Sequence, residues 1–351
     1  MIKVLVVDDS AVLRRLISTV LSRDPDLEVI GTASDGLEAI EAVTRLEPDV
    51  VTLDVEMPRL DGLGAVEKIR ETHPRLPIIM FSTLTERGAS ATLAALSKGA
   101  SDYVTKPSGS GDIAGAMAKV QEDLVPRVKA LAGARRVAAA ATSPVPPPRR
   151  APAAAAPPEV LVIACSTGGP DALSRVLPGL PATFPLPVLI TQHMPPVFTA
   201  QLAERLDRIS PLSVHEAADG ETLQAGRVLI APGDYHLRLS RRGDRARAQL
   251  DQGPRENFCR PAADPLLRSA AAGFGSGTLA VVLTGMGQDG LVGCRAVVEA
   301  GGRVVVQDEA SSVVWGMPGA VATAGLAHDV LPLDQIASRL NALCARIPSR
   351  A

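Results

Sequence analysis

Three side chains of the second half of the chain have the types needed for a nucleophilic relay. Ser166 ends an apolar run and begins Ser-Thr-Gly-Gly-Pro, His193 follows a second apolar run, and Asp289 lies in LTGMGQDG after a third. A serine hydroxyl is a weak nucleophile at neutral pH unless a histidine takes its proton and a carboxylate orients that histidine. We therefore predict a serine hydrolase with Ser166 as nucleophile, His193 as general base and Asp289 as the group that orients the imidazole.

Attack by Ser166 would also require donors for the oxygen that becomes negatively charged. Glycines follow both Ser166 and the third apolar run, and they let the backbone come close to a reacting oxygen. We expect the backbone amides of Thr167 and Met286 to be these donors. The segment Ser166–Gly169 has an alternative use as an anion-binding loop at a helix N-terminus. This segment carries no G-x-G-x-x-G motif and no Walker lysine follows it, so neither supports that use, and Ala164 breaks the G-x-S-x-G pattern.

Other residues compete for these roles. His236, which follows APGDY, is the main rival base, whereas His215 and His73 are expected to be structural. Cys165 lies inside the apolar run before Ser166 and is predicted to be a buried small hydrophobe rather than a nucleophile. Two larger alternatives also remain: a nucleotide- or phosphate-binding protein, and a regulator that binds its partner without catalysis.

The first third of the chain carries a second set of reactive groups. Asp8 and Asp9 follow the first apolar run, Asp54 follows the third, Ser82 ends the fourth and Lys106 ends the fifth. The carboxyl ends of parallel strands meet at one edge of a sheet, so these groups converge. Clustered carboxylates favour a bound cation, and oxygen ligands suit Mg²⁺. A lysine and a hydroxyl facing an aspartate predict a site for a phosphoryl group on that aspartate.

The elements that must position both sets alternate between short aliphatic strands and amphipathic helices. This alternation, present on both sides of a Pro/Ala-rich stretch, indicates an α/β protein with two doubly wound parallel sheets. We place one domain at residues 1–125, a linker at 126–158 and a second domain at 159–351. The segments His236–Ser240 and Arg247–Leu250 are expected to form a hairpin.

The composition excludes several classes of protein. The net charge is −2, so bulk electrostatics gives no reason to expect nucleic-acid binding. Four widely spaced cysteines without a C-x-x-C pair argue against a disulfide framework or a zinc site. Apolar runs are too short to span a membrane, and the first residues lack a signal-peptide core, so we expect a cytoplasmic protein without membrane insertion.

The first domain resembles a two-component receiver domain through VLVVDDS, DVVTLDVEMPRLDGL, IIMFST and GASDYVTKP. The resemblance implies a flavodoxin-like fold and phosphate transfer from a histidine kinase to Asp54. It also implies that Asp9 and Asp54 hold Mg²⁺ with help from Asp8. Ser82 and Lys106 would contact the phosphoryl oxygens, and Tyr103 would be the switch aromatic.

The whole chain resembles the chemotaxis response-regulator protein-glutamate methylesterases. IACSTGGP, TQHMPP, APGDYHL, RPAADPLL, LTGMGQDG and WGMPGAV carry this resemblance. It implies a Rossmann-like catalytic domain that hydrolyses glutamate methyl esters on the cytoplasmic helices of chemoreceptors, without a cofactor for the ester chemistry. Some members also deamidate receptor glutamines. Two departures stand out: Ala164-Cys165 replaces the usual Gly-Ala before the serine, and the linker is long and proline-rich.

Overall fold

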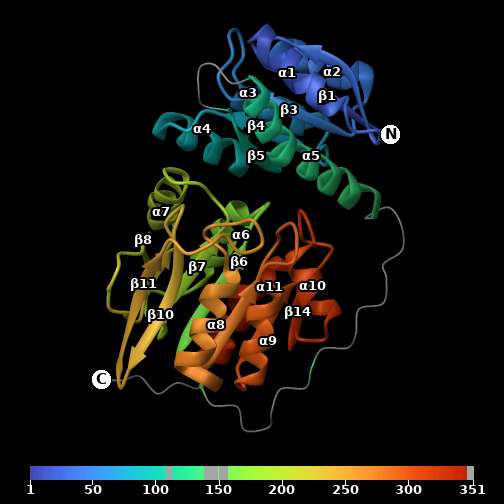
Figure 1. The fold of residues 1–351 in the computed structure, drawn as a ribbon. Helices are drawn as coiled ribbons and strands as arrows, with labels where there is room; N and C mark the ends of the chain where they lie inside the picture. The colour runs from blue at the N-terminus through green and yellow to red at the C-terminus, as the bar shows by residue number, and fades with distance from the viewer. Residues whose placement is uncertain (108–112, 138–148, 150–156, 346–351) are drawn as a thin grey trace. The chain divides into compact units, whose positions relative to one another are not determined.

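The structure is a computed structural model that describes residues 1–107, 113–137, 149 and 157–345 (Figure 1). The chain divides into two compact units, Met1–Thr142 and Ser143–Ala351. Each unit contains its own parallel sheet. Among the described residues, no helix is both long enough and apolar enough to cross a membrane.

The first unit has a five-stranded parallel sheet with the order β2-β1-β3-β4-β5. Its strands are short and almost wholly apolar, as expected for a sheet that helices cover on both faces. The bounds are β1 Ile2–Val7, β2 Leu27–Ala33, β3 Val50–Asp54, β4 Ile78–Ser82 and β5 Asp102–Thr105. The strand order reverses beside β1, which makes the crevice at the carboxyl ends of β1 and β3 the expected site.

The helices of this unit begin at side-chain caps. Ser10, Asp35, Asp61 and Thr85 each accept a hydrogen bond from a first-turn amide, which satisfies donors that have no partner within the helix. The bounds are α1 Ala11–Leu21, α2 Gly36–Leu46, α3 Gly62–Thr72, α4 Glu86–Ser97 and α5 Ile113–Val137.

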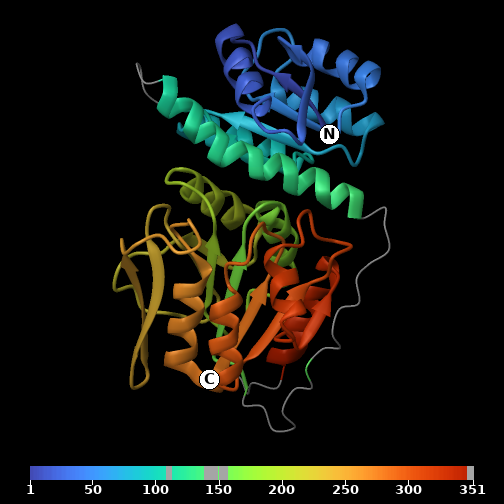
Figure 2. The same cartoon turned by 45° about the vertical axis from the view of Figure 1, so that its right-hand side comes forward.

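Helix α5 extends beyond the end expected for the first domain. Figure 2 shows this long helix from the side, and it continues through Pro126 to Val137. Residues 126–137, which the sequence prediction assigns to the linker, are therefore helical. Alanine and other good helix formers in this stretch favour the extension. Most of the remaining predicted linker lies outside the described residues.

The second unit has a seven-stranded sheet with the order β14-β13-β12-β6-β7-β9-β8, in which every pair is parallel. The first strand of the unit, β6, lies at the centre, and the chain then proceeds to either side of it. The bounds are β6 Val160–Cys165, β7 Val188–Gln192, β8 Ser213–Glu216, β9 Arg227–Ile230, β12 Thr278–Val282, β13 Arg303–Gln307 and β14 Asp329–Leu331.

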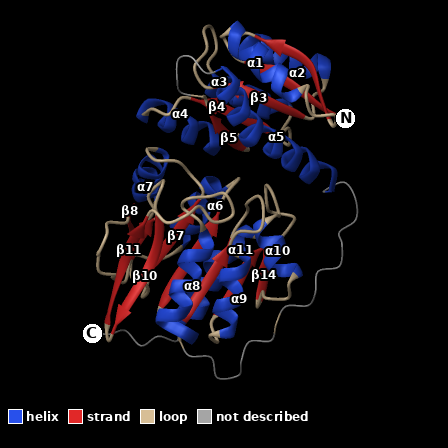
Figure 3. Cartoon of the chain, viewed as in Figure 1, coloured by secondary structure: helices blue, strands red, loops and turns tan. Residues whose placement is uncertain are grey.

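Helices flank this sheet, as the blue and red elements of Figure 3 show. Helix α8 packs against α9 and β6, whereas α6 packs against α11 and α7. The helices are α6 Gly169–Val176, α7 Phe198–Ile209, α8 Ala263–Phe274, α9 Leu291–Glu299, α10 Met317–Thr323 and α11 Leu333–Cys344, with short 3₁₀ turns η1 Leu177–Gly179 and η2 Gly275–Gly277. A separate antiparallel hairpin joins β10 His236–Arg242 and β11 Arg245–Asp251.

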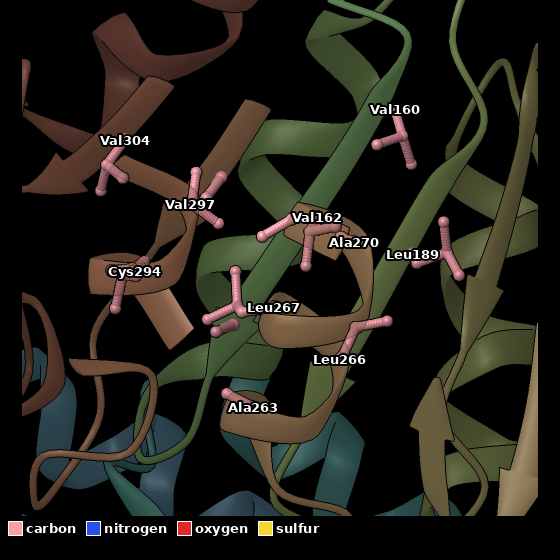
Figure 4. Packing of buried hydrophobic residues seen from close by; sticks show 14 of the residues in the cluster. Val160, Val162, Leu189, Ala263, Leu266, Leu267, Ala270, Cys294, Val297 and Val304 are labelled. Atoms are coloured by element: carbon pink, nitrogen blue, oxygen red, sulfur yellow. The ribbon is translucent and has the colours of Figure 1, made fainter. Parts of the chain in front are cut away.

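The core between β6, α8 and α9 consists of small and medium aliphatic side chains. Figure 4 shows Val162 of the central strand near Ala270 and Leu267 of α8. Each fully buried valine or leucine contributes about 1.5–3 kcal/mol relative to an exposed one. A chain in which aromatics make up 2% thus builds its core from many such contributions.

The two doubly wound parallel sheets confirm the predicted fold class. The hairpin predicted at His236–Ser240 and Arg247–Leu250 is present, and its strands are a few residues longer than expected. Helix α10 and strand β14 were not predicted, because their short segments lack a clear apolar period.

Candidate active site and phosphoacceptor pocket

Three loops at one edge of the seven-stranded sheet bring together the residues predicted for the relay. Cys165 at the end of β6 pairs with Gln192 at the end of β7, so Ser166 and His193 follow neighbouring strands. The amide of His193 donates to the carbonyl of Cys165 at 3.2 Å. Asp289 comes from the loop after β12, which pairs with β6 on its other side. The three loops therefore meet at the point where the strand order reverses.

The imidazole of His193 and the carboxylate of Asp289 are in direct contact. His193 Nε2 lies 2.7 Å from Asp289 Oδ2. Asp289 is buried, with 2% of its surface exposed, and its oxygens accept further bonds from four donors in its own loop, in the turn before α8 and at the start of α8. These donors are Asn257 Nδ2 at 2.9 Å and the backbone amides of Ala263 at 2.6 Å, Asp264 at 3.1 Å and Gly290 at 2.9 Å.

These contacts set the charges of the pair. Burial raises the pKa of Asp289, but the hydrogen bonds from His193 and the backbone outweigh it, so the pKa lies below its ordinary value. Burial lowers the pKa of His193, whereas Cys259 and Asp289 raise it, and the net result is a pKa of about 10. In this arrangement His193 keeps its proton at neutral pH and Asp289 is ionised.

Ser166 lies beside this pair but does not bond to it. Its amide donates to Thr284 O at 3.0 Å, and its carbonyl accepts from Gly169 N at 2.8 Å and Gln192 Nε2 at 3.0 Å. These bonds fix the backbone of Ser166. Within the described part of the chain, Ser166 Oγ makes no hydrogen bond.

The turn after Ser166 requires glycine at two positions. Gly168 has φ +78°, in the left-handed region that costs little only for glycine. A Cβ on Gly169 would lie 2.0 Å from Gln192 Oε1. The Thr-Gly-Gly sequence therefore allows helix α6 to begin directly after the serine.

The two predicted oxyanion donors differ in their surroundings. Thr167 is buried, and its carbonyl accepts a bond from Thr284 Oγ1 at 2.9 Å. The backbone amide of Met286 donates to no acceptor among the described residues. A Cβ on the adjacent Gly285 would lie 2.9 Å from Ser166 Cβ, so the loop that carries this amide passes close to the serine.

The rival bases are engaged elsewhere. His236 is buried, with Nε2 2.9 Å from Pro254 O and Nδ1 accepting from Ala262 N at 3.2 Å. His215 on β8 pairs with Glu221 at 2.7 Å. His73 caps helix α3 in the other unit. Cys165 is buried, and burial raises the pKa of its thiol, as the predicted hydrophobic role requires.

The turn before α8 holds residues whose roles were missed or left open. Asn257 bonds to Asp264 at 3.1 Å as well as to Asp289, so its side-chain amide supports the acid although the residue is exposed. Arg260 of the same turn pairs with Asp234 at 2.7 Å. The contact of Cys259 with His193 gave no signal in the sequence, because a single cysteine in a polar turn resembles no motif.

An apolar groove of about 900 Å³ adjoins the loop that carries Asp289. Its lining includes Gly287, Gln288, Trp315 and residues of α10. Phe258, which is 95% exposed, also lines it. Trp315 Nε1 donates to Gln307 O at 3.0 Å, which fixes the ring in the lining of the groove.

The predicted phosphoacceptor groups also meet, at the carboxyl edge of the five-stranded sheet. Carboxylate oxygens of Asp8, Asp9 and Asp54 lie within 4.8 Å of one another. Lys106 Nζ lies 2.8 Å from Asp54 Oδ2 and 3.1 Å from Asp8 Oδ2. Asp8 and Asp54 are buried, whereas Asp9 is exposed.

The charge state of Asp54 follows from this crowding. Burial raises its pKa, the neighbouring carboxylate of Asp8 adds to the rise, and Lys106 opposes it, which leaves a pKa of about 6. One amide, that of Glu56, donates to its other oxygen at 3.3 Å. Asp54 is therefore held by few donors.

The two predicted contact and switch residues lie on adjacent strands. Ser82 is the last residue of β4, and its Oγ donates to the carbonyl of Gly88 at 3.1 Å. Tyr103 on β5 is buried, and burial raises the pKa of its hydroxyl.

The donor set of this pocket fits a hard divalent cation. Three carboxylates converge from two strand ends, one of them is open to solvent, and a single lysine offsets their charge. Oxygen ligands of this kind with access to water are those that Mg²⁺ prefers.

Comparison with known proteins gives matches over both units. Residues 161–340 match the CheB methylesterase family, and residues 4–118 match the response regulator receiver domain. A protein-glutamate methylesterase/protein-glutamine glutaminase of Nocardioides sp. is 53% identical over 98% of this chain and 96% of its own length. One of the same name from Trichodesmium erythraeum is 45% identical over 96% of this chain and 97% of its own.

A solved structure matches the second unit. The CheB methylesterase catalytic domain of Thermotoga maritima is 45% identical, with a TM-score of 0.52, over 54% of this chain and 100% of that one.

Proposed function

This chain belongs to the CheB methylesterase family, and from that premise we infer that it is a protein-glutamate methylesterase under phosphorylation control. It hydrolyses methyl esters of receptor glutamates in chemotaxis-type signalling. The names of its relatives add the deamidation of protein glutamines. We propose that both reactions use one site.

In the proposed mechanism Ser166 Oγ attacks the ester carbonyl of the receptor side chain and its proton passes to His193. Because Asp289 holds Nε2, the accepting nitrogen is Nδ1. The tetrahedral intermediate collapses, and His193 returns the proton to the leaving methoxide, which departs as methanol. Water then attacks the acyl-serine with the same histidine as base, and the glutamate carboxylate and Ser166 are restored.

Asp289 would keep the imidazole oriented and stabilise the imidazolium that forms in each step. The donors to its oxygens keep this carboxylate ionised. The amides of Thr167 and Met286 would stabilise the oxyanion, and loss of one such donor costs about 100- to 1,000-fold in kcat.

The observation that carries the proposal is the 2.7 Å contact of His193 Nε2 with Asp289 Oδ2 directly beside the loop of Ser166. A base and its orienting acid at the carboxyl edge of a parallel sheet have no structural need to be buried together. Hydrolysis by the neighbouring serine accounts for them.

In the first unit we propose Asp54 as the residue that a histidine kinase phosphorylates. The receiver match supports this role. Asp9 and Asp54, with Asp8, would hold Mg²⁺, which neutralises charge on the transferred phosphoryl group. Ser82 and Lys106 would bind the phosphoryl oxygens, and Tyr103 would report the change. Lys106 already lies 2.8 Å from the accepting carboxylate.

The substrate is proposed to be a helix of a chemoreceptor, presented in the cytoplasm. A helix is too wide to enter a narrow cleft, so its ester must be reached on an open rim. The groove beside Asp289, with Trp315 and Phe258, offers an apolar surface of this kind next to the reacting groups.

Mass spectrometry of methylated receptor peptides incubated with the phosphorylated full-length protein tests the function. We expect loss of one methyl group per modified glutamate, and none with Ser166→Ala. Ser174→Ala is a matched control, because this serine of α6 bonds only within its own helix, to Pro170 O. Full activity of Ser166→Ala would refute the nucleophile assignment.

A further inference from the structure

Cys259 contacts the imidazole ring of His193 at the nitrogen that Asp289 does not hold. Its Sγ is 3.5 Å from His193 Nδ1, while Asp289 holds Nε2. Cys259 is partly exposed, whereas the other three cysteines of the chain are buried. Both nitrogens of the ring are thus engaged, and the one that should face the hydroxyl of Ser166 faces a thiol.

The local backbone is built to place the thiol there. Glu256 and Cys259 exchange backbone hydrogen bonds of 3.2 and 2.9 Å, which closes a tight turn around Asn257 and Phe258. Both central residues have positive φ, 50° and 64°, a conformation that costs non-glycine residues roughly 1–3 kcal/mol each.

Contacts made by this turn offset that cost. Asn257 bonds to the buried Asp264 and Asp289, which fixes the turn to the acid of the active site. As a result Phe258 points outward and is 95% exposed, while the next side chain, Cys259, reaches His193. One turn therefore links the acid, the base and the groove.

From this contact we propose that Cys259 is a positioning residue that competes with Ser166 for Nδ1 of His193. In the structure the thiol contacts Nδ1 of the imidazole. Catalysis requires that Nδ1 leave the thiol and accept a hydrogen bond from Ser166 Oγ. This inference rests on the esterase function proposed above and adds a device that restrains its base.

The charged groups near His193 define the expected pH dependence. Cys259 faces it from the turn before α8, and Asp289 faces it from the loop after β12. Asp264 and Arg268 of α8 lie beyond Asp289 and interact with its charge. Cys259 and Asp289 raise the pKa of His193 to about 10 against the effect of burial.

A raised pKa means that the imidazole remains protonated over a wider pH range. A protonated imidazole cannot accept the proton of Ser166, so esterase activity falls as pH drops through this pKa. Removal of the thiol lowers the pKa and extends activity to lower pH.

The test compares full-length wild type with Cys259→Ala and Cys259→Ser in the receptor-peptide assay. For both variants we expect the acid limb of kcat/KM to move down by about one pH unit or more, which corresponds to about tenfold more free base at a pH on that limb. Cys344→Ala, a buried cysteine of α11, is the control and should leave the limb in place.

A purely structural role for Cys259 would lower activity at every pH without moving the limb, and that result would overturn the proposal. If wild type shows neither demethylation nor labelling of Ser166 by a fluorophosphonate, the esterase function itself fails. The two failures are therefore distinguishable.

A second measurement needs no variant. Methyl methanethiosulfonate converts the thiol of Cys259 to a neutral methyl disulfide and releases methanesulfinate, and a thiol reductant reverses the change. In the ¹⁵N-histidine spectrum of the wild-type chain, we expect the pKa of His193 to fall on modification and to return on reduction. A pKa unchanged by verified modification of Cys259 would also overturn the proposal.

Discussion

Asp54 and Asp289 are both buried aspartates at the carboxyl edge of a parallel sheet, yet their surroundings differ. Asp54 has one amide donor and one lysine, next to two other carboxylates, and its pKa is raised to about 6. Asp289 accepts from three backbone amides, an asparagine and a histidine, and its pKa is lowered.

The number of donors separates the two functions. A carboxylate with few donors keeps electron pairs available, so it can attack phosphorus and accept a phosphoryl group. A carboxylate with five donors is a poor nucleophile but a rigid partner for an imidazole. The same residue type at the carboxyl edge of each parallel sheet thus serves covalent transfer in one unit and orientation in the other.

The largest expected effect comes from removing the charge of the orienting aspartate. Asp289→Asn should lower kcat for receptor demethylation by about 10,000-fold, because the amide no longer favours the required imidazole tautomer. Steady-state assays with methylated receptor peptide measure the loss, and the exposed Asp334→Asn of α11 is the control. A loss of less than tenfold would mean that Asp289 does not orient the base.

The same substitution in the other unit should have a different result. Asp54→Asn should abolish phosphate incorporation from a phosphorylated histidine kinase, and with it the whole of the stimulation that phosphorylation gives. Radiolabel transfer and the demethylation assay report the two effects in parallel. Incorporation at an unchanged level would place the phosphoacceptor elsewhere.

A smaller effect is expected when one donor to Asp289 is removed. Asn257→Ala leaves the carboxylates of Asp264 and Asp289 each short of one bond, which costs about 1–3 kcal/mol. We expect kcat to fall about 5- to 150-fold while phosphorylation of Asp54 continues. Unchanged kcat would show that the backbone amides alone hold the acid.

The smallest expected effect is on the way the free energy of unfolding of each unit depends on pH in Mg²⁺-free buffer. The ordinary aspartate pKa is 3.8 and that of Asp54 is about 6, so this residue destabilises its unit above about pH 6 and ceases to do so as pH falls toward 3.8. Asp289 has the opposite effect, because its pKa is lowered. It stabilises its unit above pH 3.8, and that contribution is lost as the pH falls further.

Thermal unfolding of wild type, Asp54→Asn and Asp289→Asn between pH 4 and 8 checks these signs. We expect Asp54→Asn to raise the unfolding temperature of its unit near neutral pH and Asp289→Asn to lower that of the other. Changes of the same sign in both variants would contradict the comparison.

Much of this arrangement could be predicted from the sequence. The chain order of short aliphatic runs fixed which residues stand at strand ends, and strand ends of a parallel sheet converge. For this reason the sequence alone predicts that Ser166, His193 and Asp289 meet at the carboxyl edge of the second sheet. It likewise predicts that Asp8, Asp54 and Lys106 meet at the carboxyl edge of the first sheet.

Other features depend on contacts that a linear pattern does not carry. Asn257 and Cys259 lie in a turn whose positive φ angles depend on tertiary hydrogen bonds, so their contacts with Asp289 and His193 were not foreseen. The boundary between the first domain and the linker is also not decided by the sequence, because alanine-rich sequence suits both a helix and a linker, and residues 126–137 are helical.

The most direct test of the serine relay is the rate at which a fluorophosphonate labels the full-length protein. We predict one adduct, on Ser166, formed at least about 100-fold more slowly in His193→Ala and Asp289→Asn, and absent in Ser166→Ala. An adduct on another residue, or equal rates in all three proteins that retain Ser166, would contradict the relay.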